Sequence, residues 1–166
     1  MNCSVCGKEN EVLDPAFRRP DAVAAMPENL RKLRVKENDD LCEIRTGVDA
    51  EPSRCFVRCV LKVDVLDHPD PVSWGVWVEV GKDDFQHVLD EWSEPIQTTE
   101  PAMTAHLANS IPGYSETIGL QMSMRLTGPE TRPELLIDHS INHPFANDVR
   151  QGVSHQRVQE WLDFAR

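Results

Sequence analysis

Hydrophobic and polar residues alternate along several stretches of the chain, and a period of two predicts β-strands. The longest stretch, residues 54–66, has charged residues on one side. Its other side consists of Cys55, Val57, Cys59, Leu61, Val63 and Val65. Residues 72–80 alternate in the same way after the turn-forming HPDP, so the two stretches predict a hairpin. Residues 117–126 give a further strand, and two shorter runs at 41–45 and 134–138 are also predicted to be strands.

A period of three to four residues predicts three helices. The first begins at Pro27 and ends before the acidic Asn38–Asp40 stretch, and the second covers residues 82–92. The third follows the capping residue Ser154 to the end of the chain. Residues 93–114 contain three prolines and no clear period, which predicts a long irregular segment.

Strands and helices that do not alternate regularly favour an α+β domain over a doubly wound parallel sheet. We therefore predict one domain over residues 1–166, an antiparallel sheet with helices packed on one face. Residues 1–20, which contain a Cys-x-x-Cys pair, are predicted to form a zinc-knuckle-like arm packed on the domain.

The charge of the chain narrows the classes of partner. Its 17 Lys and Arg residues stand against 28 Asp and Glu residues, giving a net charge of −11 with neutral histidines. Such a surface repels phosphate backbones and favours encounter with a basic protein, so we expect no nucleic-acid partner. No apolar run approaches the ~20 residues that span a bilayer, and no secretory signal pattern is present, so we expect a soluble cytoplasmic protein without a membrane partner.

Several motifs, taken in order, resemble a known family. They are CSVCG at residues 3–7, DDLC at 39–42, FVRCVLKVDV at 56–65, WGVWVEV at 74–80, IPGY at 111–114, RPELLI at 132–137 and HPFANDVRQGV at 143–153. The chain resembles the bacterial domain-of-unknown-function family numbered 2199 over nearly its whole length. The resemblance implies a small soluble bacterial protein and no assigned activity. The family pattern places a histidine four residues after the second cysteine, where this chain has Asn10.

The cysteines indicate a structural zinc ion as the candidate cofactor. Cys3 and Cys6 have the spacing of half a zinc knuckle, and the resemblance adds Cys42 to this set. Cys55 and Cys59 are ~13 Å apart on an extended strand, so at most one of them joins. The fourth ligand is left open between His143, His68, Cys55 and water, and ordinary thiols or a redox pair are the alternatives to zinc.

Two further features carry candidate chemistry. His139 and His143 lie near Asp138 and Asp148, so this segment is interpreted either as a metal or general-base site, or as a turn in which a histidine bonds to the backbone. Trp74 and Trp77 point to opposite faces of one strand. One therefore belongs to the core, and the other is either an exposed contact residue or is covered by a loop.

Three functions follow from these patterns. The first is a non-enzymatic, immunity- or inhibitor-like module that binds a basic protein. The second is an enzyme or small-ligand-binding domain that uses residues 93–114 and 139–148. The third is a structural or accessory domain. The sequence contains neither a G-x-S-x-G nucleophile motif nor a glycine-rich phosphate loop, and it leaves the oligomeric state open.

Overall fold

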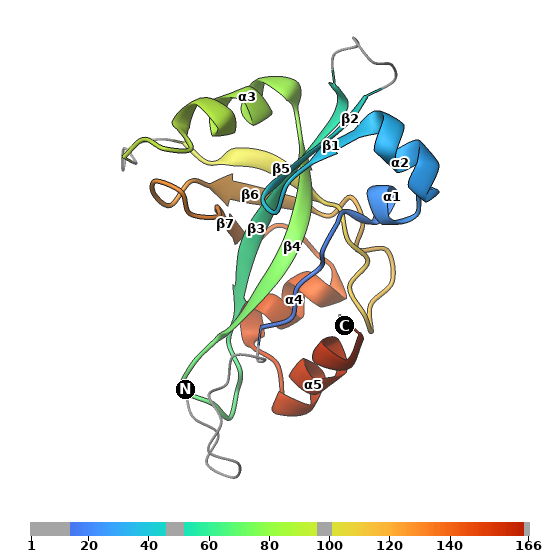
Figure 1. Ribbon diagram of the computed structural model, residues 1–166. Coiled ribbons are helices and arrows are strands. Elements are labelled where there is room, and N and C mark those ends of the chain that lie inside the picture. The colour runs from blue at the N-terminus through green and yellow to red at the C-terminus, as the bar shows by residue number, and fades with distance from the viewer. Residues whose placement is uncertain (1–13, 46–51, 96–100, 165–166) are drawn as a thin grey trace, which may run out of the picture.

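Seven strands form one sheet in the computed structural model, which describes residues 14–45, 52–95 and 101–164 (Figure 1). The strands follow one another in chain order across the sheet. They are β1 (Val35–Glu37), β2 (Leu41–Arg45), β3 (Pro52–Val63), β4 (Val72–Val80), β5 (Met103–Leu107), β6 (Gln121–Arg125) and β7 (Glu134–Leu136). The predicted hairpin of two long strands is confirmed, because β3 and β4 pair antiparallel from Cys55–Val80 to Val63–Val72.

The sheet closes on itself, because β3 pairs with two strands along the same edge. The Pro52–Val57 part of β3 pairs with β2, and Val60 pairs in parallel with Glu134 of β7. The backbone N–H of Val60 also donates to the carbonyl of Pro133 at 2.9 Å. Strands β3 to β7 therefore form a closed five-stranded barrel, from which β1 and β2 extend as a hairpin. The prediction of an α+β fold is confirmed, whereas the prediction of a purely antiparallel sheet is wrong.

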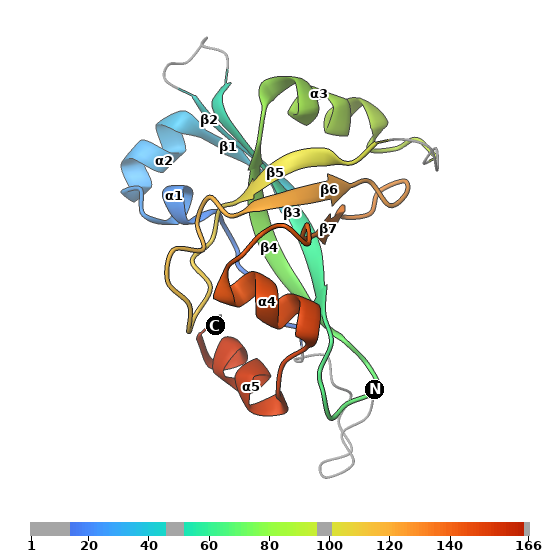
Figure 2. The same ribbon diagram turned by 180° about the vertical axis from the view of Figure 1, so that it is seen from behind.

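The barrel interior holds the main hydrophobic core. The alternating residues of β3 from Cys55 to Val63, and Val65 just after the strand, all lie in it, as the period of two predicted. Helices α3 (Lys82–Glu91), α4 (Pro144–Gln151) and α5 (His155–Phe164) each add buried side chains to this core. Figures 1 and 2 show α3 at one end of the barrel and α4 and α5 at the other. The prediction that helices cover one face is therefore wrong, because a closed barrel has open ends to cover and no single exposed inner face.

A second, smaller core lies on the outside of the barrel. Its buried members are Val23, Cys42, Phe56, Trp77 and Ala108. The indole Nε1–H of Trp77 donates to the carbonyl of Phe17 at 3.1 Å, and Phe17 packs against this cluster. Helix α1 (Asp21–Ala24) contributes Val23. Trp74 lies in the main core, so the two tryptophans face opposite sides as predicted, and the N-terminal segment covers Trp77.

The segment from Asp14 to Pro20 lies against β4. The N–H of Phe17 donates to the carbonyl of Gly75 at 2.9 Å, and the N–H of Gly75 donates to the carbonyl of Pro15 at 2.8 Å. A Cβ on Gly75 would lie 2.9 Å from the Cβ of Ala16, so only glycine permits this approach without a shift of the chain. Residues 1–13 of the predicted arm, with Cys3, Cys6 and Asn10, lie outside the described residues.

The predicted helices agree with the structure better than the predicted loops do. Helix α2 (Glu28–Arg34) follows Pro27, and the N–H of Arg157 donates to the Ser154 hydroxyl oxygen at 3.2 Å at the start of α5. The irregular segment 93–114 contains β5, and the predicted 139–148 loop contains the start of α4. Short elements beside prolines carry too few periodic positions to be recognised.

Candidate functional site

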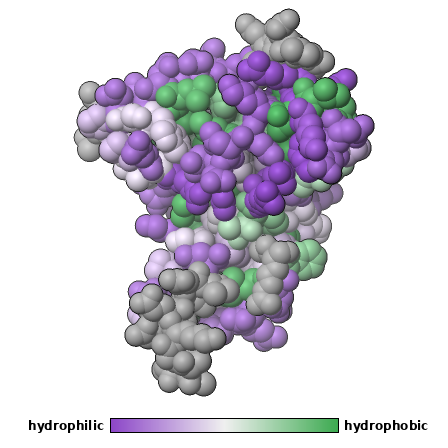
Figure 3. Space-filling view, viewed as in Figure 1, coloured by the Kyte–Doolittle hydropathy of each residue, from purple (hydrophilic) through white to green (hydrophobic). Residues whose placement is uncertain are grey.

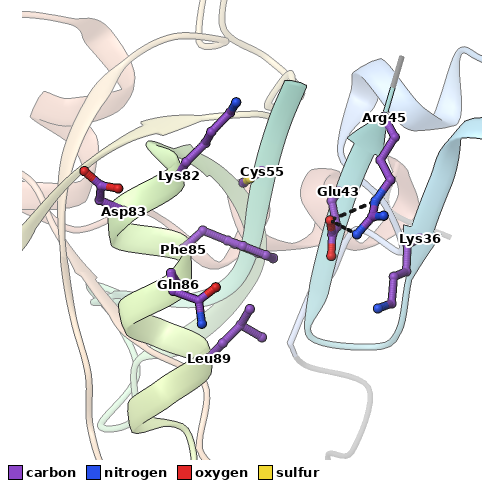
Figure 4. A pocket seen from close by; sticks show the side chains of 9 residues that line it. All are labelled: Lys36, Glu43, Arg45, Cys55, Lys82, Asp83, Phe85, Gln86 and Leu89. Carbon is purple, nitrogen blue, oxygen red and sulfur yellow. Dashed lines mark hydrogen bonds and ion pairs between the residues drawn. The ribbon is translucent and has the colours of Figure 1, made fainter. Parts of the chain in front are cut away.

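A groove of about 530 Å³ separates α3 from the β1–β2 hairpin (Figure 4). It is lined by Lys36, Glu43, Arg45, Cys55, Lys82, Asp83, Phe85, Gln86 and Leu89. An adjoining recess of about 220 Å³ extends it towards Asn38 and Leu41 at the hairpin turn. The groove exists because the hairpin leaves the barrel beside the helix that covers its end.

The groove has an apolar floor. Figure 4 shows Phe85 and Leu89 pointing from α3 towards the hairpin. Phe85 and Val88 are buried and anchor α3 on the barrel, whereas Leu89 leaves 42% of its surface exposed. The helical period predicted all three on one apolar face. The structure buries two of them and leaves the third in the groove, where it offers a contact for an apolar side chain.

Charged side chains form the walls of the groove. Arg45 and Glu43 of β2 make an ion pair at 3.0 Å, drawn as a dashed line in Figure 4. Burial raises the pKa of the Cys55 thiol, and Glu43 raises it further, while Lys82 lowers it. Cys55 is therefore favoured as the protonated thiol at neutral pH. The groove thus joins an apolar floor to charged walls of both signs.

His143 is the N-cap residue of α4. Its Nδ1 accepts from the N–H of Phe145 at 3.0 Å, so its Nε2 carries the proton and donates to the carbonyl of Ser115 at 2.9 Å. Both ring nitrogens thus have backbone partners. This is the backbone-bonding turn histidine that the sequence offered as one interpretation of the segment.

Several other polar groups of the 138–150 segment also bond within the chain. The Tyr114 hydroxyl donates to Asp148 at 2.5 Å, and burial together with this bond raises the pKa of the tyrosine. Arg150 donates to the carbonyls of Asp138 and Ile141. The hydroxyl and backbone N–H of Ser140 hold the Asp138 carboxylate and lower its pKa. These bonds stabilise the turn before α4, and His139 lies exposed at the surface.

The thiol of Cys42 is enclosed by apolar side chains. It lies fully buried in the outer core, beside Phe56 and Trp77. Burial, and then Glu37, raises the pKa of its thiol to about 12. Cys3 and Cys6 lie outside the described residues, so the zinc set of Cys3, Cys6 and Cys42, with His143 as a possible fourth ligand, stays a prediction. Of the alternatives, His68 accepts the N–H of Asp70 in a turn, and Cys55 lines the groove.

Replacing Cys42 with alanine should leave the zinc content of the purified protein unchanged, because its side chain is fully buried among the apolar residues of the outer core. Metal analysis of the wild-type and Cys42→Ala proteins tests this. The paired replacement of Cys3 and Cys6 by serine is the control, since any zinc held by these two residues is lost there. A fall in zinc on replacing Cys42 alone would return it to the ligand set.

The described part of the chain has neither a cluster of metal ligands nor a helix that could span a membrane. Residues 14–45, 52–95 and 101–164 hold no group of three or more His, Cys, Asp or Glu side chains placed to bind one metal ion. In the same part of the chain, each helix is too short or too polar to cross a membrane.

Comparison with known proteins gives one match. Residues 2–153 match the family model described as "Uncharacterized protein conserved in bacteria (DUF2199)". No curated protein matches the chain, and no solved structure matches it.

Proposed function

We propose that this chain, which belongs to the DUF2199 family of uncharacterized bacterial proteins, is a non-enzymatic protein-binding module of the immunity or inhibitor kind. In this proposal the groove between α3 and the β1–β2 hairpin receives a segment of a basic partner protein. The observation that carries the proposal is the exposed leucine, Leu89, on the floor of a groove with charged walls.

The acidic residues of α3, on one side of the groove, support a basic partner, while the lining itself holds Lys36, Arg45 and Lys82 beside Glu43 and Asp83. Residues 82–94, which contain α3, hold five carboxylates and one lysine, a net charge of 1 − 5 = −4. Asp83 and Asp90 lie on the same side of α3 as the groove-lining Gln86, whose amide donates to Asp90 at 2.9 Å. A segment with one apolar and two or three basic side chains would place the apolar group on Leu89 and the cations beside these acids.

An enzyme or small-ligand site at residues 139–148 has less support. His143 uses both ring nitrogens on the backbone, and Asp148 accepts the Tyr114 hydroxyl. A general base needs a free lone pair and access to its substrate.

A photoreactive amino acid at position 86 should form covalent adducts with a basic protein in the bacterial cell, because the Gln86 side chain lines the groove. The same amino acid at the exposed position of Gln156, on α5, is the control and should give no such adduct. Mass spectrometry identifies the adduct, and its isoelectric point decides whether the partner is basic.

Leu89→Asp should abolish the adduct, since a carboxylate on the floor cannot accept the partner's apolar group without a large desolvation cost. Leu136→Asp is the matched control, because Leu136 is 40% exposed on β7 and lies outside the groove. Equal adduct yields for these two variants, or adducts with acidic proteins only, would refute the proposed function.

A further inference from the structure

A further recess, of about 290 Å³, lies between α2 and β1. It is lined by Arg19, Glu28, Arg31, Lys32, Val35 and Glu37. Four of these residues, at positions 28, 31, 32 and 35, are three or four apart and therefore follow one face of α2 into β1. None of the six lines the groove between α3 and the hairpin, and Glu37 alone also borders the recess that extends that groove.

Two of the three cations in this recess are already paired. The Nε of Arg19 lies 2.9 and 3.1 Å from the two carboxylate oxygens of Glu37, and the Nζ of Lys32 lies 3.2 Å from Glu28. Both acids of the recess are thereby neutralised. The third cation, Arg31, is partly buried, and its guanidinium has no hydrogen-bond or ion-pair partner among the described residues. Its five N–H donors therefore face the recess without an acceptor from the chain.

The surroundings of the recess are positive in an otherwise acidic protein. Residues 18–37 contain six Lys and Arg residues and three acidic residues, so their net charge is 6 − 3 = +3. All other residues together carry 11 − 25 = −14. Figure 3 shows mostly hydrophilic side chains over α2, around a smaller hydrophobic area. A small anion is therefore repelled by most of the protein surface and attracted to this part of it.

We propose that the recess between α2 and β1 binds a small oxyanion, a carboxylate or a phosphate group, on the guanidinium of Arg31. The planar fork of a guanidinium donates two parallel hydrogen bonds to the oxygens of either group. Val35 offers an apolar contact for the carbon atoms next to that group. Ligand pockets usually measure ~300–1,000 Å³, so this recess suits a small organic acid or phosphate monoester better than a nucleotide.

The neighbours of Arg31 can join the same ligand. Arg19 uses its Nε and Nη2 on Glu37, which leaves its Nη1 as a further donor. The pair of Lys32 with Glu28 is exposed on both sides, at 74% and 70%, so it is weak and Lys32 can turn to the anion.

A ligand explains Arg31 better than a structural role does. A partly buried cation loses hydration, and a facing anion restores the lost interaction. A structural arginine pairs with a carboxylate of the chain, as Arg19 does with Glu37. None of the side chains of α2 is buried, and a seven-residue helix is marginal in water by itself. An oxyanion held by Arg31 on α2, and by Arg19 beside β1, would fix the helix to the sheet.

NMR of the full chain, followed at the arginine Nε–H groups, tests the site. Inorganic phosphate and succinate are added separately to the protein in a chloride buffer of constant ionic strength. We expect the Arg31 signal to shift and saturate with a dissociation constant on the order of 1 mM. Saturation by either anion supports the site, and the anion that binds more tightly identifies whether the ligand is a phosphate or a carboxylate.

Three variants separate the recess from the general positive charge. Arg31→Gln should raise the dissociation constant at least ~10-fold, because it removes a charge-assisted bidentate contact. Arg34→Gln is the matched control, since it makes the same change of charge on the same helix outside the recess, and it should change the constant less than ~2-fold. Arg31→Lys keeps the charge without the fork and should lie between them. Circular dichroism checks that each variant is folded.

Two results would overturn the site. One is the absence of saturation by either anion up to ~50 mM, which leaves only diffuse attraction. The other is an equal loss of binding in Arg31→Gln and Arg34→Gln, which would assign the anion to the field of the whole basic segment. Cross-linking at position 86 does not involve this recess, so either proposal can fail while the other stands.

Discussion

Replacing Trp74 with alanine should lower the free energy of unfolding by about 3–5 kcal/mol. Trp74 is fully buried on β4, and its ring stacks on Phe17 with centroids 5.0 Å apart and planes 8° from parallel. On its other side it contacts Trp161 of α5 at 5.5 Å. One side chain therefore joins the N-terminal segment, the barrel and the C-terminal helix, and its loss leaves a cavity that no single element can fill.

Trp74→Phe separates the volume of the ring from its polar group. The indole Nε1–H of Trp74 is buried without a hydrogen-bond partner, and so is that of Trp161. Phenylalanine removes this unsatisfied donor and keeps most of the stacking. Trp74→Phe should therefore lower the free energy of unfolding by much less than Trp74→Ala does. Trp77→Phe is the contrasting control, because it breaks the bond to the Phe17 carbonyl.

Urea unfolding gives the free energy of unfolding of all three variants. Circular dichroism is the signal to follow, because each variant removes a tryptophan and so changes the fluorescence. A Trp74→Phe variant as unstable as Trp74→Ala would show that the buried Nε1–H has a partner after all. A cost below ~1 kcal/mol for alanine would show that the cluster repacks without it.

The elements predicted from the sequence are those whose pattern is long and local. Strands β3 and β4 have enough alternating positions to fix their faces, and α5 has a capping serine followed by an apolar stripe. Barrel closure depends instead on Val60 and Glu134, which are far apart in the chain and form a single bridge. No local period records such a contact, so the sequence could not distinguish a closed barrel from an open sheet.

The candidate site was harder to predict than the fold. The cysteines drew attention because a C-x-x-C spacing is visible in a sequence, but Cys42 is a core residue. The sequence places Lys36 in the helix that begins at Pro27, and it places Leu89 on the buried face of the helix over residues 82–92. Both residues line the groove instead. A signal for the groove was the apolar stripe of three residues on α3 and the C-cap Trp92, more than a short helix at a barrel end can bury.

The segment that holds α1 and α2 in place depends on one buried amide, Asn109. Its Oδ1 accepts from the N–H of Trp77 at 2.7 Å, and its Nδ2 donates to the carbonyl of Arg19 at 2.9 Å and to the carboxylate of Asp21 at 3.0 Å. The second oxygen of Asp21 accepts from the N–H of Ser110. Asn109 thus joins β4, the end of β5 and the start of α1, although the sequence placed it in an irregular segment.

Asn109→Asp should therefore destabilise the protein by about 3–5 kcal/mol at neutral pH. Aspartate cannot donate to the Arg19 carbonyl, and its charge would lie beside that of Asp21 at a fully buried position. Both effects raise the pKa of the new carboxyl in the folded state above its unfolded value of ~3.9. The folded state then favours the neutral form of this carboxyl. The loss in the free energy of unfolding relative to the wild type should therefore become smaller as pH falls towards 4 and larger as pH rises.

Asn109→Ala is the control that separates charge from hydrogen bonding. It leaves both the N–H of Trp77 and the carbonyl of Arg19 without their partner but introduces no titrating group, so we expect a loss of about 2–4 kcal/mol that does not depend on pH between 4 and 7. Urea unfolding of both variants and the wild type over this range gives the two differences. A pH-independent penalty for Asn109→Asp would mean that its carboxylate reaches water. The start of α1 would then have moved off the barrel, and the basic α2 helix that follows it would have lost its fixed position beside the groove.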